Sequence, residues 1–483
     1  MTTEPELITP PGVTTSANLR RNTLTGGEAT ATSLASIGPA IGSIFLISSI
    51  ASGVGPAIGF AILIGGIGFL LHINSMAEFN RKMPSAGGYT HYAAKVFGGR
   101  VGAMTGMMYL IAGLGIAIAL VLQLGIFVSA AVQGIFSYNL SWWIPAVVFS
   151  AMITVLLVRG IKISIRVVVT LFLFEVLSIL ISAIVMLIVN HHFISTAAFN
   201  PGEVHNGVVG IGAAFVLSIF MFTGASSPAP LAEETIRPKK TVPTALLVAT
   251  TAAIVIYLFV SWALVTAFHN NATSILNTPL PFLVGAEHAL KPLGDLLYIA
   301  GSTSAIAVLI GDANSYSRAF YHLSRENLLP KSFGRIHPTW HTPWITIVSL
   351  MSLSLVVALL VGGLVGAGNA FNYLATLGTI AFVMLYLLMN VAVPVYFHRE
   401  HRSEFSILRH LVIPVLGIVA LAYPLWETAK PSQPYPYNWF GAIGLVFVVL
   451  SIAFGMVKLS PASSKLMGSH GFEEEVVSLG KEG

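Results

Sequence analysis

The chain has 483 residues, of which 55% are hydrophobic and only 9% are charged. This composition excludes a soluble globular protein, in which about 25% of the residues are usually charged. Apolar runs close to the length that crosses a bilayer as a helix recur along the whole sequence. We therefore predict an all-α integral membrane protein in the cell membrane. The net charge of +5 is explained by basic loops, so nucleic-acid binding is not expected.

The apolar runs predict twelve transmembrane helices between two polar tails, 1–30 and 458–483. Among the 24 lysines and arginines, all but Lys291 and Lys430 fall in the tails and in loops that would share one side of the membrane. Because basic residues gather on the cytoplasmic side, both termini are expected to be cytoplasmic. The predicted spans are 32–52, 56–79, 101–133, 142–158, 164–190, 207–231, 242–267, 293–320, 343–363, 371–397, 409–428 and 437–457.

The sixth predicted span is interrupted near its end. Residues 220–235 read FMFTGASSPAPLAEET, and proline lacks the amide hydrogen that an interior helical turn needs. Broken backbone at membrane depth is tolerated only where it is buried in protein or lines a cavity. This pattern indicates a broken helix that binds something. The alternative is a proline-kinked helix repaired by the hydroxyls of Thr223 and Ser226.

The first predicted span contains a second interruption, IGPAIGS at residues 37–43. The two breaks lie five spans apart, as expected for an inverted repeat of five plus five helices with a ligand bound where the half-helices meet. Helix N-termini at such a place offer free N–H groups and the positive end of the helix dipole to a carboxylate. Two independent kinks are the alternative interpretation.

With these breaks in place, the order of further motifs resembles the amino acid–polyamine–organocation (APC) superfamily of permeases. The resemblance covers roughly residues 20 to 400. In the loop after the eighth span, Glu326 and Asn327 stand where the family pattern has Asp and Gly. The motifs that carry the resemblance, besides the two breaks, are PSAGGY at 84–89, GIKISIR at 160–166, AEETIRP at 232–238, SR at 317–318 and RENLLP at 325–330.

The resemblance implies a LeuT-like fold and a secondary transporter, not an enzyme, that works by alternating access around a central site. Its ten-helix transport core would span 31–400, with inverted repeats at about 31–190 and 207–400. Two additional transmembrane helices would follow in 401–457.

The resemblance also implies which residues bind the substrate. Main-chain N–H groups of the first break would hold a carboxylate, and carbonyl groups of the sixth-span break would hold the amino group. Proline at position 39 removes one of the N–H donors. In the first break the implied residues are Ile37, Gly38, Pro39, Ala40, Ile41, Gly42 and Ser43. In the sixth span they are Thr223, Gly224, Ala225 and Ser226, with Phe220 and Phe222 lining the side-chain pocket.

Glu175 is an acidic residue in the middle of the fifth predicted span. Ionisable residues inside the membrane are expensive to bury and are candidates for function. Similar proton-coupled permeases carry a lysine at this position, so the glutamate departs from that pattern. An apolar environment favours the neutral form of a carboxyl group, which makes Glu175 a candidate for proton coupling. A structural, permanently protonated glutamic acid and a sodium ligand are the alternatives.

Four further charged residues are candidates for a gate. Asp312 lies in the eighth span, six residues before Arg318, and either pairs with a basic inner-loop residue or contacts the substrate. Glu233 and Glu234 follow the sixth span and face Arg237, Lys239 and Lys240 in sequence. They form either an inner gate or a solvated cluster.

The remaining function classes have less support. The sequence lacks cysteine and the GxxxxGK[ST] motif of a nucleotide-driven pump, and we expect no catalytic residues, no metal site and no cofactor. A neutral amino acid is the preferred substrate because both broken stretches are uncharged. An amine, a polyamine or a cationic amino acid is the alternative substrate, and a membrane sensor or a channel is a less favoured function. Proton coupling or exchange is expected, with sodium as the less favoured ion.

Overall fold

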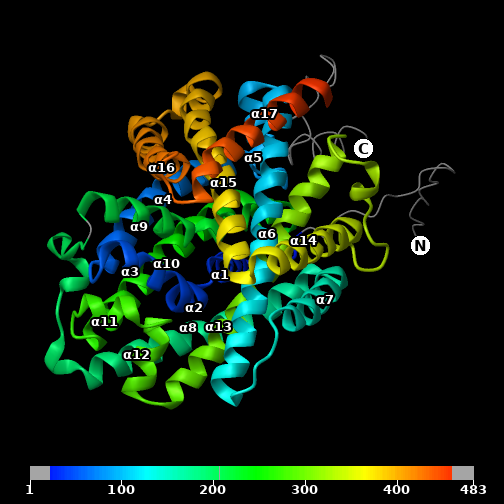
Figure 1. The fold of residues 1–483 in the computed structure, drawn as a ribbon. Helices are drawn as coiled ribbons and strands as arrows, with labels where there is room; N and C mark the ends of the chain where they lie inside the picture. The colour runs from blue at the N-terminus through cyan, green and yellow to red at the C-terminus, as the bar shows by residue number, and fades with distance from the viewer. Residues whose placement is uncertain (1–21, 206, 459–483) are drawn as a thin grey trace, which may run out of the picture.

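Helices make up nearly all of the structure, a computed structural model that describes residues 22–205 and 207–458 (Figure 1). Within these residues the only β pairing is one isolated parallel bridge, between Leu24 and Thr235. Most of the two predicted tails, 1–21 and 459–483, lies outside the described residues. The first helix begins at Gly26, within the tail predicted at 1–30.

The helices are numbered in chain order. The first half of the chain contains α1 (Gly26–Ile37), α2 (Pro39–Ile41), α3 (Ile47–Val54), α4 (Ile58–Lys82), α5 (Tyr89–Phe97), α6 (Gly99–Phe136), α7 (Trp143–Arg159), α8 (Ile161–Val189) and α9 (Gly207–Phe220). The second half contains α10 (Pro238–Ala267), α11 (Ala272–Asn277), α12 (Pro281–Ala289), α13 (Pro292–Arg325), α14 (Trp344–Val365), α15 (Ala367–Glu400), α16 (Ile413–Ala429) and α17 (Phe440–Lys458). Two π-helical segments are η1 (Gly42–Leu46) and η9 (Leu408–Val412). The 3₁₀ segments are η2 (His191–Phe193), η3 (Ala197–Phe199), η4 (Pro201–Glu203), η5 (Thr223–Ser226), η6 (Ala229–Glu234), η7 (Lys331–Gly334), η8 (Arg402–Glu404) and η10 (Tyr437–Trp439).

Ten helices in the described part of the chain are long and apolar enough to cross a membrane, when the first broken helix is counted as one. The two other predicted spans coincide with shorter helices. They are α7, with 17 residues, and α9, with 14 residues. Large apolar side chains such as Leu177, Leu364 and Val419 are exposed on the outward faces of the spans, where lipid would cover them. The protein is therefore a multi-pass membrane protein.

The first span starts with a strong helix signal and is interrupted at Gly38. Thr25 and Glu28 form a capping box at the start of α1, in which the Thr25 N–H donates to Glu28 Oε2 at 2.8 Å. Gly38 then adopts φ 68°, a left-handed conformation that favours glycine. The chain continues through α2, the π-helical η1 and α3. The predicted break is present, but it is confined to one non-helical residue.

The sixth span breaks more severely. Helix α9 ends at Phe220, and the two 3₁₀ segments η5 and η6 follow. The half-helix that we expected after the break is not α-helical but consists of 3₁₀ turns.

The two interrupted segments lie at the centre of the bundle. Helix α1 packs against η5, and α3 packs against α9, so both halves of the first span contact the sixth. Around them, α6 packs against α13 and α15, and α4 packs against α10. In Figure 1 the labels of α1 and α2 lie in the middle of the view, while α16 and α17 lie toward one edge. The core of the protein is therefore built around the two breaks.

Candidate functional site

The two predicted breaks are in direct contact. The Ser33 hydroxyl of α1 donates to the Ala225 carbonyl at 2.7 Å. A Cβ atom on Gly224 would lie 2.0 Å from the Ser36 carbonyl oxygen, so only glycine fits between the two backbones. The structure thus brings the sequence-predicted residues of the first break together with Thr223–Ser226 of the sixth span.

Most polar main-chain groups of the first break already have protein partners. The Gly38 N–H donates to the Leu34 and Ala35 carbonyls, and the Gly42 N–H donates to the Gly38 carbonyl. The Ile41 N–H donates to the Ser304 hydroxyl of α13 at 3.3 Å. The Ala40 N–H is faced by Glu175. A substrate carboxylate would therefore have to compete for the donors that we assigned to it.

The carbonyl groups at both breaks are also met by side-chain hydroxyls. The Tyr257 hydroxyl of α10 donates to the carbonyls of Ile37 and Gly38, at 3.4 and 3.3 Å. The Tyr386 hydroxyl of α15 lies 3.5 Å from the Thr223 carbonyl. Both tyrosines stabilise broken backbone, and Tyr386 lies at the sixth-span carbonyl groups that we predicted to hold the substrate amino group.

Glu175 lies on α8 and is fully buried against the first break. Its carboxyl group faces the Ala40 N–H and the Ser304 hydroxyl. Neither carboxyl oxygen reaches hydrogen-bonding geometry with any described residue. A buried acid with unsatisfied oxygens is costly unless it is protonated or compensated. The predicted coupling residue therefore contacts the break itself.

Asp312 lies on α13, on the other side of the first break. Its side chain is 4% exposed, and its Oδ2 accepts a hydrogen bond from the Tyr316 hydroxyl at 3.1 Å. The Ser36 hydroxyl of α1 faces the same carboxyl group. No basic residue in the described part of the chain forms an ion pair with Asp312. Its role in a gate stays a prediction, whereas its place beside the break is part of the structure.

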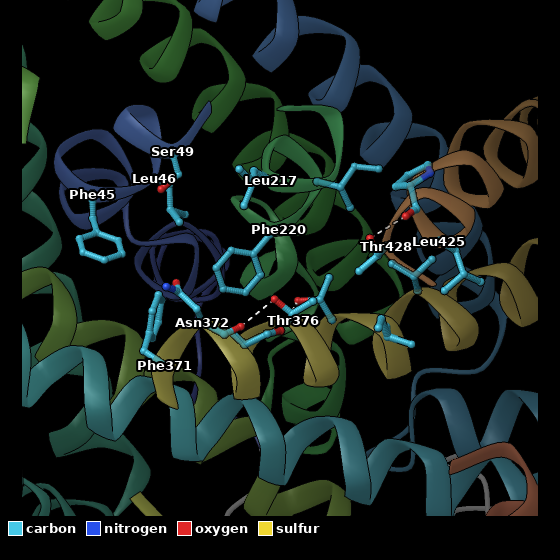
Figure 2. Close-up of a pocket in the computed structure, with 16 residues that line it drawn as sticks. Phe45, Leu46, Ser49, Leu217, Phe220, Phe371, Asn372, Thr376, Leu425 and Thr428 are labelled. Atoms are coloured by element: carbon cyan, nitrogen blue, oxygen red, sulfur yellow. Dashed lines mark hydrogen bonds between the residues drawn. The ribbon is translucent and has the colours of Figure 1, made fainter. Parts of the chain in front are cut away.

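Phe220 and Phe222 have different environments. Phe222 is fully buried, stacked on Phe69 at 5.9 Å and edge-on to Tyr257 at 5.7 Å, so it packs in the core. Phe220 lines an open cavity between η1, α3, α9, α15 and α16. Figure 2 shows the Phe220 ring between Leu46 and Thr376 in this cavity. Phe220 thus lines this cavity, whereas Phe222 packs in the core.

The predicted gate residues at the other end of the sixth span form two ion pairs. Arg318 of α13 donates from Nε to Glu234 Oε2 at 2.5 Å, and both side chains are almost fully buried. Arg325 pairs with Glu233 at 3.4 Å and is partly exposed. The sequence suggested Arg237, Lys239 and Lys240 as partners for the two glutamates. Glu234 instead pairs with an arginine 84 residues away.

The chain before α1 closes the same end. The N–H groups of Thr23 and Leu24 donate to the Glu234 carbonyl at 2.8 and 3.0 Å, and the Ile236 N–H donates to the Leu24 carbonyl at 2.8 Å. The Leu24 side chain is fully buried against Ile161 and Leu231. We call residues 22–25 the N-terminal strap. Along the sixth span, the cavity lies before the break, beside Phe220, and the N-terminal strap lies after it, beside Glu234. The two ends of the central region therefore differ.

Sequence reasoning missed several residues at the breaks. Ser36 contacts Asp312, Tyr257 contacts the first break, and Tyr316 holds Asp312. A single hydroxyl or tyrosine in an apolar helix is usual, so no local pattern marks these residues. The one available signal was the spacing of Asp312 and Tyr316, because residues four apart share a helix face.

Comparison with known proteins independently tests the resemblance to the permease family. The sequence profile of the amino acid permease family matches residues 31–457. The chain is 24% identical over 442 residues to the methylthioribose transporter of Bacillus subtilis, covering 86% of this chain and 88% of that protein. It is 26% identical over 404 residues to the low-affinity putrescine importer PlaP of Escherichia coli, covering 79% and 83%.

A third relative is the branched-chain amino acid permease BcaP of Bacillus subtilis, with 27% identity over 299 residues, covering 59% of this chain and 57% of that protein. The family and these relatives are transporters, and the resemblance to the APC superfamily is confirmed. The profile extends through both breaks and into the last helix, so it covers the site as well as the scaffold. The chain therefore belongs to the amino acid permease family.

Proposed function

We propose that this protein is a secondary active transporter that moves amino acids across the cytoplasmic membrane by alternating access. The observation that carries this proposal is the contact between the two broken segments, with buried acids on both sides of the first break. One side of this region borders a cavity, and the other is closed by the Arg318–Glu234 pair and the N-terminal strap. A site closed at one end at a time is what alternating access requires.

The proposal includes a topology. Twelve transmembrane helices would form a LeuT-like core at 31–400, with inverted repeats at 31–190 and 207–400, followed by two helices in 401–457. The lysines and arginines of the loops would place both termini in the cytoplasm. In this orientation the N-terminal strap and the Arg318–Glu234 pair close the cytoplasmic side, and the cavity beside Phe220 faces outward.

For the substrate, a neutral amino acid is our first candidate, because residues 37–43 and 220–227 carry no charge. An amine or a cationic amino acid is the second candidate. Asp312 favours it, since this buried carboxyl group lies against Ser36 beside the first break. The relatives described above are named as a methylthioribose transporter, a putrescine importer and a branched-chain amino acid permease. Family membership therefore leaves both candidate substrates open.

For energy coupling, we propose that Glu175 exchanges a proton during the transport cycle. It is buried, its oxygens lack hydrogen bonds in the described structure, and it faces the main chain of the first break. Gaining or losing a charge there would change the interactions of the segment that binds substrate. Sodium is the less favoured ion, since a sodium site needs several converging oxygen ligands.

The test is uptake of a radiolabelled amino acid panel and of putrescine into proteoliposomes, with and without an inward proton gradient. We expect gradient-driven accumulation by the unmodified protein. Glu175→Gln keeps the shape of the side chain but cannot ionise, so accumulation should fall to the level seen without a gradient while exchange of substrate persists.

Glu287→Gln, an exposed glutamate on α12, is the matched control and should transport normally. If Glu175→Gln accumulates substrate like the unmodified protein, proton coupling through Glu175 is wrong. If putrescine moves and no amino acid does, the substrate class is wrong, but alternating access around the breaks is retained.

A further inference from the structure

We propose that Asp312, together with the tyrosines around it, binds a protonated amino group of the transported substrate. This inference rests on the proposed transport function and assigns the chemical class of the group that the site selects. It places the specificity for an ammonium group on a side chain of α13, in addition to the backbone carbonyls of the broken spans.

The first argument is that, among the described residues, no cation lies beside the buried Asp312 carboxyl group. A carboxylate has about four positions that accept hydrogen bonds. Asp312 accepts one from the Tyr316 hydroxyl at 3.1 Å and faces the Ser36 hydroxyl. Its side chain is almost completely buried, and no ion pair among the described residues includes it. Burying an ionised carboxylate is costly unless a cation compensates it. An ammonium group of the substrate would supply that cation.

The second argument is the aromatic surrounding of this carboxyl group. The Tyr316 ring lies 6.1 Å from the rings of Tyr109 and Phe382, and Tyr386 lies 5.8 Å from Phe382. Asp312 lies within electrostatic range of Tyr109 and Tyr386. Aromatic faces attract ammonium groups through their negative quadrupole, and the attraction is stronger away from water. The carboxyl group and the rings therefore select the same kind of ligand.

The third argument is a set of buried polar atoms without hydrogen-bond partners. Ser36 Oγ and Ser227 Oγ are buried and make no hydrogen bond with any described residue. Ser36 faces Asp312, and Ser227 follows the sixth-span break. Buried hydroxyls are normally satisfied. Asp312 itself can accept from the Ser36 hydroxyl, so Ser227 is the atom that points to a ligand supplying the missing partner. An ammonium group has three N–H donors and matches acceptors of this kind.

The position along α13 separates Asp312 from the proposed coupling residue. Glu175 faces Ser304, and Asp312 lies eight residues further along the same helix, a rise of about 12 Å. The N–H donors of the first break are engaged on the Glu175 side, by Ser304 and by Glu175 itself. The Asp312 side instead offers a carboxyl group that forms no ion pair in the described part of the chain. The two acids therefore serve different functions, proton exchange and ammonium binding.

The test uses pairs of compounds that differ only in an amino group. Purified full-length protein would be assayed for binding of radiolabelled leucine and putrescine, with competition by 2-hydroxyisocaproate and 1,4-butanediol, in which hydroxyl groups replace the amino groups. We expect the unmodified protein to prefer the amino compound by about 10- to 100-fold, the range of a charge-assisted hydrogen bond. Asp312→Asn should remove this preference, and Asp312→Glu should retain part of it.

Asp295→Asn, an exposed aspartate on the same helix, is the control and should keep the full preference. The inference is overturned if the unmodified protein binds both members of each pair equally, a result that does not depend on any variant being folded. It is also overturned if Asp312→Asn keeps the preference for the amino compound. If the unmodified protein binds none of these compounds, the proposed amino acid and amine specificity fails as well. Equal binding of both members would overturn the role of Asp312 alone.

Discussion

Replacing Arg318 with leucine is expected to destabilise the protein by about 3–5 kcal/mol, the usual effect of removing one partner of a buried ion pair. Arg318 and Glu234 are 0% and 1% exposed, and Arg318 also donates to the Asn314 side chain at 3.0 Å. Without the guanidinium, the Glu234 carboxylate would remain buried with no cation. Thermal unfolding of the detergent-solubilised protein, followed together with the yield of monodisperse protein, measures the change.

Two further variants distinguish the destabilisation caused by an unpaired buried charge from the destabilisation caused by lost packing. In Arg318→Leu/Glu234→Leu both charges are absent, and much of the stability should return, because buried pairs can be replaced by apolar residues at little cost. Glu404→Gln breaks the exposed Lys82–Glu404 pair and should change stability by no more than about 1 kcal/mol. A double variant as unstable as Arg318→Leu would contradict the uncompensated charge as the cause.

Replacing Gly224 with alanine is expected to abolish transport and to lower the stability by about 1–3 kcal/mol or more, as overpacking of a tight contact does. The new methyl group would lie 2.0 Å from the Ser36 carbonyl oxygen and 2.4 Å from its carbonyl carbon. Both atoms belong to backbone, so the first and sixth spans would have to separate. The uptake assay and the thermal unfolding described above measure the two effects.

Gly363→Ala is the matched control, because this exposed glycine on α14 has no atom within 4 Å of the position of a Cβ. In a helix interior, alanine is favoured over glycine by about 1 kcal/mol, so this variant should be at least as stable as the unmodified protein. Normal transport by Gly224→Ala would show that the close contact of the two breaks is unnecessary for function.

The closed end of the protein links these predictions to the proposed transport cycle. Glu234 binds Arg318 through its side chain and the N-terminal strap through its carbonyl group. Release of substrate on the cytoplasmic side would require these contacts to separate. A buried ion pair suits such a gate, because its two charges can each be solvated once water enters.

The sequence by itself determined the class of the protein and the positions of its interruptions. Apolar runs near 20 residues are a local property, and they mark the spans whatever the packing. Glycine at position 38 and proline at 228 and 230 disrupt helices locally, and the structure has its breaks there. The expected α-helical half after the sixth-span break was wrong, because the chain there forms the 3₁₀ segments η5 and η6.

The tertiary structure alone decided which side chains meet at the breaks. The carboxyl group of Glu175 reaches Ala40, Asp312 reaches Ser36, and Arg318 reaches Glu234. These partners are far apart in the sequence, and the residues around one partner do not identify the other. Composition and spacing within one helix contain no information about which helices become neighbours. That information lies in the packing of α1 against α8, α13 and η5, which fixes the chemistry of the site.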